Sequence, residues 1–246
     1  HRILGRSIGL LFFIPFIYFV FKKILNISLI IKLIGISLLI LLQGFIGWFM
    51  VRSGLTENLS VSHYRLSLHL LIAFIIFSSL IWLSFNHYFK TNKKFFSIKS
   101  SYIFLKVLIS LIFLQLIIGA FVSGLDAGKI YQTWPLMNGT FFPSDNFLNN
   151  FFNFNDPSFV QFAHRIIAYI IFFLSVYSGF FIYNNKIKAL YNSYIIFILI
   201  IFLQILLGII ILYSNVNIYF ASLHQISSIF LILSTLNLYF RSIRTN

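Results

Sequence analysis

Cysteine is absent from this chain of 246 residues, and acidic residues are rare, with only four Asp and Glu in all. Without thiols the chain can form no disulfide, can bind no metal through thiolate and has no cysteine nucleophile. Any metal chemistry must therefore use histidine, with carboxylates as minor candidates.

Charge of either sign is scarce as well. Charged residues make up 9% of the chain and hydrophobic residues 60%, whereas soluble domains carry about 25% charged residues. Apolar runs of about 20 residues, the length that crosses a bilayer as a helix, recur along the chain. The sequence therefore predicts an all-α polytopic membrane protein with spans at 3–21, 29–50, 64–85, 101–124, 159–183, 192–213 and 218–240.

The net charge of +14 would suit a nucleic-acid partner, but the cations are distributed as topology signals. Twelve of the 18 Lys and Arg lie in or beside alternate links or after the last span: Lys22, Lys23, Lys32, Lys90, Lys93, Lys94, Lys99, Lys106, Lys186, Lys188, Arg241 and Arg244. The positive-inside rule predicts that these segments and the C-terminus are cytoplasmic. The opposite side is predicted to carry all four acids and the long loop at 125–157.

An internal repeat relates the two halves of the chain. His-Arg-Ile at 1–3 recurs at 164–166, a Gln-x-x-x-Gly motif occurs at 43–47 and again at 204–208, and the pattern Tyr-x-x-Ser-Leu-His at 64–69 returns at 219–224. Such a parallel repeat is known among membrane proteins. It predicts two four-helix bundles, one in 1–90 and one in 91–246. Because span 101–124 has no counterpart in the first half, we expect its partner before residue 1, giving eight spans in the intact protein and seven here.

Four histidines occupy repeat-related positions: His1, His69, His164 and His224. In the predicted topology each lies in the outer third of a span that runs from outside to inside, where an ionisable side chain is costly and usually functional. A single buried histidine is more often a hydrogen-bonded helix contact than a ligand. Four at matched depth instead predict two sites in which paired imidazoles bind a heme iron axially.

Arginines near these histidines are candidates for binding heme propionates. Arg65 lies four residues before His69, on the same helical face, and Arg165 directly follows His164. The alternative is that each arginine anchors a helix end at the lipid headgroups, and sequence alone leaves both readings open.

The motifs resemble those of the heme A synthase family, in its proteobacterial and mitochondrial form without loop cysteines. The resemblance covers nearly the whole chain, and its most specific block runs from Asp-Ala-Gly to Trp-Pro-Leu-Met. The matching stretches are His-Arg-Ile-Leu-Gly-Arg at 1–6, Gln-Gly-Phe-Ile-Gly-Trp-Phe-Met-Val-Arg-Ser-Gly-Leu at 43–55, Ser-His-Tyr-Arg-Leu-Ser-Leu-His-Leu at 62–70, residues 119–137, Gln-Phe-Ala-His-Arg at 161–165 and Leu-His-Gln at 223–225.

The resemblance implies oxidation of the C8 methyl of heme O to the formyl group of heme A, for terminal cytochrome oxidases, in a bacterial inner membrane. It also implies a resident heme b and a substrate heme O, each near a histidine pair. With it we assign His164, His224 and Arg165 to heme b, and His1, His69 and Arg65 to the substrate. The family's essential glutamate would precede residue 1, so no catalytic residue is assigned in this sequence.

Expected partners are heme O, heme O synthase, an electron donor and membrane lipid, and a homo-oligomer is left open. Two other functions use the same features. A bis-histidine cytochrome b-type electron carrier would need the same ligands, and a transporter could share the parallel repeat. Reaction with added heme O separates the enzyme from the carrier, and absence of pigment would favour the transporter.

Overall fold

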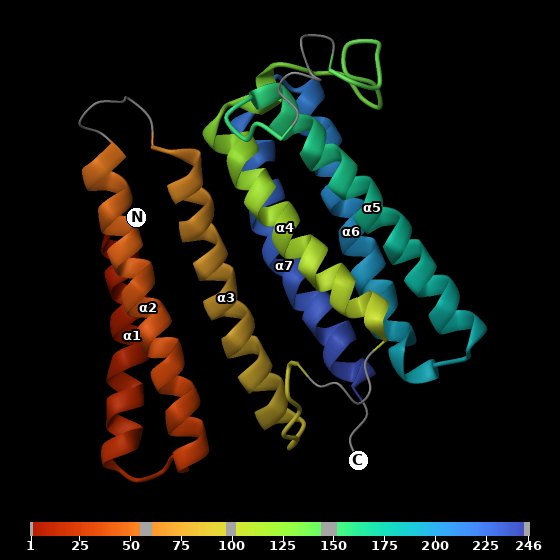
Figure 1. The fold of residues 1–246 in the computed structure, drawn as a ribbon. Helices are drawn as coiled ribbons and strands as arrows, with labels where there is room; N and C mark the ends of the chain where they lie inside the picture. Colours follow the sequence, from red (N-terminus) through yellow and green to blue (C-terminus); the bar gives the residue numbers. More distant parts are fainter. Residues whose placement is uncertain (1, 55–60, 97–101, 144–151, 244–246) are drawn as a thin grey trace. The chain divides into compact units, whose positions relative to one another are not determined.

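A computed structural model of the chain describes residues 2–54, 61–96, 102–143 and 152–243 (Figure 1). These residues form seven α-helices long and apolar enough to cross a membrane, which confirms the predicted all-α polytopic fold. The helices are α1 Arg2–Phe21, α2 Ile27–Gly54, α3 His63–Tyr88, α4 Ile103–Gly124, α5 Pro157–Asn184, α6 Tyr191–Tyr213 and α7 Ile218–Ser242, with short 3-10 turns η1 Ala127–Lys129 and η2 Lys188–Leu190.

Two helices begin at a polar cap, α5 shortly before its predicted start at 159 and α7 at its predicted start at 218. Asp156 precedes α5, and its carboxylate accepts a hydrogen bond from the Ser158 amide while Pro157 begins the helix. Asn217 precedes α7, and its side chain accepts from the Tyr219 amide. Both residues satisfy an amide that the helix itself cannot, which fixes where α5 and α7 begin.

The chain divides into two compact units, 1–80 and 81–246. In the first unit α1 packs against α2. The described Cα atoms of α2 and α3 nowhere come within 8 Å, so these helices meet only through side chains. The Arg65 guanidinium, for example, lies 5.0 Å from the centroid of the Phe49 ring. Apolar side chains of α1 and α2 are widely exposed, as expected for helices that face lipid.

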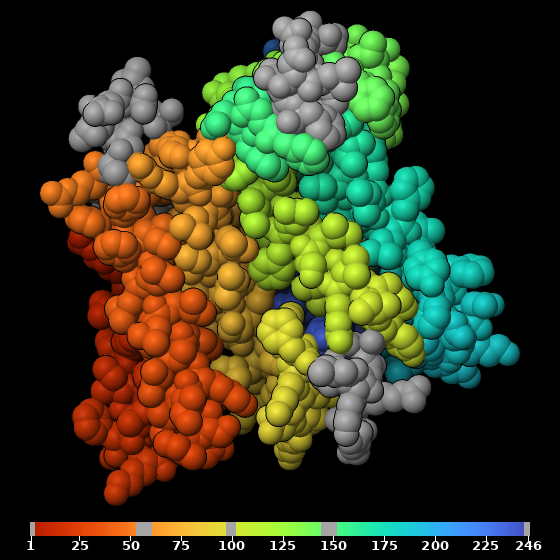
Figure 2. Space-filling view, viewed as in Figure 1, coloured from red at the N-terminus to blue at the C-terminus, as the bar shows by residue number. Residues whose placement is uncertain are grey.

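The second unit contains a four-helix bundle of α4 to α7. Helix α4 packs against α5 and α7, and α6 packs against the same two helices. The hairpin interfaces α4–α5 and α6–α7 are the most extensive, and Figure 2 shows the side chains of α4 and α5 in contact on the visible face. Helices α5 and α7 are therefore diagonal to each other, on opposite sides of the bundle.

The end of the second unit at which α7 ends is closed by the segment after α3. The Trp82 indole donates to the Lys93 carbonyl at 3.0 Å, and its ring lies against those of Tyr239 and Phe240. The Lys93 ammonium donates to the Phe240 carbonyl at 2.9 Å. Burial, and then the nearby Arg241 charge, lower the pKa of Lys93. The last turns of α3 thus pack with α7.

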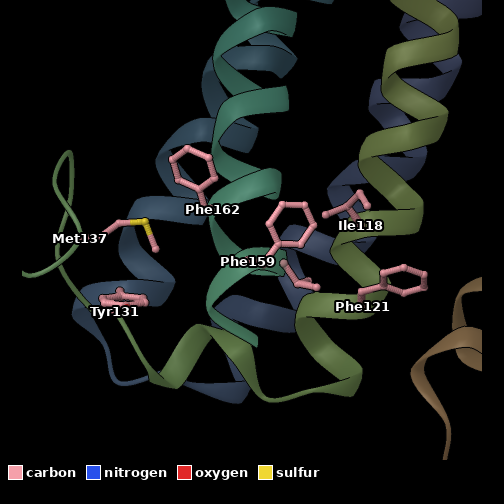
Figure 3. Packing of buried hydrophobic residues seen from close by; sticks show 7 residues of the cluster. Ile118, Phe121, Tyr131, Met137, Phe159 and Phe162 are labelled. Atoms are coloured by element: carbon pink, nitrogen blue, oxygen red, sulfur yellow. The ribbon is translucent and has the colours of Figure 1, made fainter. Parts of the chain in front are cut away.

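The opposite end is covered by the loop that joins α4 to α5. Tyr131 and Met137 of this loop are buried against α4 and α5 (Figure 3). The apolar cluster that they enter also contains Ile118, Phe121, Phe159, Val160 and Phe162. A loop of this length without helix or strand periodicity is usually functional or disordered, and its described part is a packed cap.

Candidate functional site

His164 lies near the second turn of α5, where α4 closes around its ring. The Gln115 side-chain nitrogen is 3.2 Å from His164 Nε2 and donates to the His164 carbonyl at 3.0 Å. One turn along α4, a Cβ atom at Gly119 would lie 3.2 Å from His164 Cε1. The glycine thus leaves room for the imidazole against the helix backbone. We call such a Gln-x-x-x-Gly pair that faces a histidine a cradle.

The hairpin α6–α7 has a second cradle with different contacts. The Gln204 side-chain nitrogen donates to the His224 carbonyl at 3.2 Å and to Ser227 Oγ at 2.9 Å. A Cβ atom at Gly208 would lie 3.7 Å from His224 Cε1, an ordinary contact distance. Gln204 therefore contacts only the backbone of α7 at His224. Gln115, in contrast, contacts both the ring and the backbone carbonyl of His164 on α5.

The first unit contains a third cradle between α2 and α3. The Gln43 side-chain nitrogen lies 3.4 Å from His69 Nε2, and a Cβ atom at Gly47 would lie 3.0 Å from His69 Cε1. Each cradle stands in the later part of one helix and receives a histidine from the early part of the next. The Gln-x-x-x-Gly motif at 43–47 and 204–208, which also occurs at 115–119, was the sequence signal for this contact, although the pattern alone gives no partner.

His164 and His224 both belong to the bundle of the second unit. They stand on the diagonal helices α5 and α7, each in the first part of its helix. In the part of the chain that the structure describes, Nδ1 of each ring is buried without a hydrogen-bond partner. An unsatisfied buried polar atom costs about 1–3 kcal/mol, so these two rings are incompletely satisfied by protein alone.

This arrangement fits a planar metal macrocycle better than a bare ion. Among the described residues, no three His, Cys, Asp or Glu side chains gather as ligands for an ion. A heme iron takes most of its ligands from the macrocycle, so two histidines of the protein, His164 and His224, would be enough to hold it. The histidines of the second unit would therefore suit a heme.

Arg165 forms hydrogen bonds with the loop that covers this end of the bundle. Its side chain is 9% exposed, and it donates to the Tyr131 carbonyl at 3.0 Å and to the Leu136 carbonyl at 3.3 Å. Gln161 donates to the same Tyr131 carbonyl at 2.8 Å. Direct contact between Arg165 and a cofactor stays a prediction, but the guanidinium already has a structural partner that sequence reasoning missed.

The other predicted site residues are not brought together in the same way. Arg65 is four residues before His69 on α3, and its guanidinium lies over Phe49 of α2. His1 lies outside the described residues, so the predicted pairing of His1 with His69 stays a prediction.

Comparison with known proteins identifies the family. Residues 1–236 match the family described as cytochrome oxidase assembly protein, COX15-CtaA. A relative in Pelagibacter ubique named heme A synthase is 43% identical, over 95% of this chain and 69% of the relative. Relatives with the same name are 41% identical in Rickettsia bellii, over 94% and 70%, and 40% identical in Wolbachia pipientis wMel, over 94% and 65%. The resemblance seen in the motifs is confirmed, and the chain belongs to the COX15-CtaA family of cytochrome oxidase assembly proteins.

Proposed function

We propose that this protein is a heme A synthase, an oxidoreductase that converts the C8 methyl of heme O to the formyl group of heme A. The observation that carries the proposal is the pair of cradled histidines, His164 and His224, on diagonal helices of one bundle. The name of the relatives, heme A synthase, supports the reaction. The ligand pair supports a heme within the bundle.

We assign the resident heme b to the second unit and the substrate to the first. His164 and His224 would hold the heme b iron, which supplies electron-transfer chemistry when bound. Arg165 would contribute to binding this heme by holding the α4–α5 loop in place, because it donates to two carbonyls of that loop at the same end of α5. His1 and His69 would bind heme O.

The difference between the two units supports this assignment. Arg65 stands where the repeat has Phe220 in the second half. A charged residue at that position suits a site that must admit and release a ligand with carboxylates, because a buried carboxylate needs a charged partner. The apolar counterpart suits a heme that stays. Heme O synthase, as the source of the substrate, and an electron donor are the proposed partners.

The function is tested by supplying heme O to the purified full-length protein with a reductant and oxygen, then identifying the extracted hemes by mass. We expect heme A to accumulate while heme b remains. Heme B given in place of heme O is the control and should yield no heme A. Heme O recovered unchanged beside bound heme b would instead support an electron carrier, and a protein without pigment would support a transporter.

We further propose that the protein lies in the bacterial inner membrane with its C-terminus in the cytoplasm. The lysine-rich links at 22–32, 86–106 and 184–190 would be cytoplasmic, because cations accumulate on that side. A reporter that works only in the cytoplasm is expected to be active when it is fused at Lys94 or after Arg244. A fusion in the 125–157 loop is the control and should be active only outside. Activity outside at Lys94 would reject this orientation.

A further inference from the structure

We propose that a cleft between the α4–α5 loop and α5 is a phospholipid site, in which Arg165 and Tyr169 bind the phosphate of the headgroup. The site goes beyond the proposed function, because it takes a ligand other than heme and does not use the histidines. The cleft is lined by Met137 and Phe141 of the loop and by Phe162, Arg165, Ile166 and Tyr169 of α5.

The cleft lies on the side of α5 that is turned away from His164. Successive residues of an α-helix are about 100° apart around its axis, so the lining residues of α5 stand about 100–160° from His164. The His164 ring instead contacts α4, where Gln115 and Gly119 lie against it. The α5 helix itself would therefore separate a ligand in the cleft from a heme at His164.

Arg165 carries a buried charge that no carboxylate of the described residues neutralises. Its side chain is 9% exposed, and Nη1 and Nη2 donate to neutral carbonyls of the loop. Its Nε is buried without a hydrogen-bond partner in the described part of the chain. The described acids have other partners, Asp126 with Lys129 and Asp156 with the first turn of α5. A buried charge in a span is costly unless an opposite charge accompanies it, so we expect an anion beside Arg165.

Tyr169 supplies a second donor to the same cleft. It follows Arg165 by four residues and so lies on the same side of α5. Long side chains of a helix lean toward its N-terminus, which brings the Tyr169 hydroxyl toward the guanidinium. Within the described ranges this hydroxyl has no hydrogen-bond partner. A guanidinium and a hydroxyl one turn apart suit a phosphate, whose oxygens accept several hydrogen bonds.

The depth of the cleft indicates that the phosphate belongs to a lipid. Helix α5 has 28 residues and is about 42 Å long, close to the thickness of a bilayer with its headgroups, about 40–45 Å. Arg165 is eight residues from Pro157, the first residue of the helix, or about 12 Å along it. This places its backbone just below the headgroup region, and its side chain reaches back toward the loop.

The same face of α5 continues away from the loop as an exposed apolar stripe. Residues 170, 173, 177 and 180 stand within about 40° of Ile166 around the helix, and all four side chains are exposed. The stripe would give the acyl chains of a bound lipid a surface directly beside the cleft. Because every phospholipid carries a phosphate at this depth, lipid is the source of the anion that we infer.

The test is a titration of the delipidated full-length protein with phosphatidylglycerol in detergent. Native mass spectrometry measures the dissociation constant of the first lipid bound. Tyr169→Phe removes only the hydroxyl, and Tyr177→Phe, on the exposed stripe, is the matched control. Because Tyr169→Phe loses a hydrogen bond to a charged group, we expect about 10-fold weaker binding, whereas Tyr177→Phe should change the affinity by no more than about 2-fold.

Two competitors identify the source of the phosphate. Diacylglycerol with the same acyl chains lacks the phosphate, and inorganic phosphate lacks the chains, so neither should displace the lipid at equal concentration. Equal lipid affinity in the two tyrosine variants, or displacement by diacylglycerol, would overturn the phosphate site, and displacement by inorganic phosphate would make it a site for a free anion. A heme b spectrum that shifts in Tyr169→Phe would assign the cleft to the heme instead. The titration itself needs no bound heme, so failure of the proposed heme site would leave its result unchanged.

Discussion

Replacing His164 or His224 by alanine is expected to remove the stable heme b spectrum from the full-length protein. In the proposed site both imidazoles would hold the iron, so the loss of either would leave it with a single protein ligand. Among the described residues, no third His, Cys, Asp or Glu gathers with these two histidines to replace a lost ligand. Reduced-minus-oxidised absorbance of the purified variant, scaled to protein, measures the effect, and we expect near-complete loss.

The first unit supplies the contrast for this experiment. Replacing His69 or His1 by alanine should stop conversion of heme O while heme b is largely retained, because these residues are assigned to the substrate. The reverse result, with heme b lost from the first-unit variants and kept in the second-unit variants, would exchange the two assignments. Equal loss of heme b from all four variants would mean that the two halves do not bind separate hemes.

Replacing Arg165 by leucine is expected to release the cap over the α4–α5 end of the bundle. The change removes two charge-assisted bonds, to the Tyr131 and Leu136 carbonyls, while each carbonyl keeps one other donor, Gln161 and Thr133 respectively. Bonds to charged groups contribute about 1.5–3 kcal/mol each, and the remaining donors offset part of their loss. We expect the cap to lose about 2–4 kcal/mol of local stability, measured as faster hydrogen exchange in residues 131–137.

An ion pair in the same loop provides the control. Lys129 and Asp126 lie 3.1 Å apart, but their side chains are 58% and 71% exposed. Exposed pairs contribute about 0–1 kcal/mol, so Asp126→Asn should change exchange in the cap little. If Asp126→Asn loosened the cap as much as Arg165→Leu, burial of the guanidinium would not be the source of its effect.

Helix positions could be predicted from the sequence because the membrane imposes a single rule. A span must be apolar for its whole length and must satisfy its backbone internally, so each apolar run marks a helix. The ends were less certain, since caps such as Asp156 and Asn217 lie outside the apolar run. The path of the loop after α4 could not be predicted, because it depends on which buried positions Tyr131 and Met137 reach.

The candidate site was predictable only in part, and for a different reason. The repeat singled out the histidines, because the same residue at the same depth in both halves is hard to explain by packing alone. Their contacts with Gln43 and Gln115 depend on the rotation of neighbouring helices, which periodicity does not fix. Arg165 shows the same limit: its position beside His164 favoured a cofactor contact, whereas its donors reach a loop that is distant in sequence.

The cradles also bear on how such a protein is put together. In each case the glutamine and glycine precede the histidine within one helical hairpin. A hairpin that has formed in the membrane would therefore already position its histidine. Hairpins α4–α5 and α6–α7 have their largest interfaces internally and smaller ones with each other. A heme bound by one histidine from each hairpin would then link the two hairpins. Assembly of the second unit would then be the docking of two hairpins, and the bound heme would hold them together.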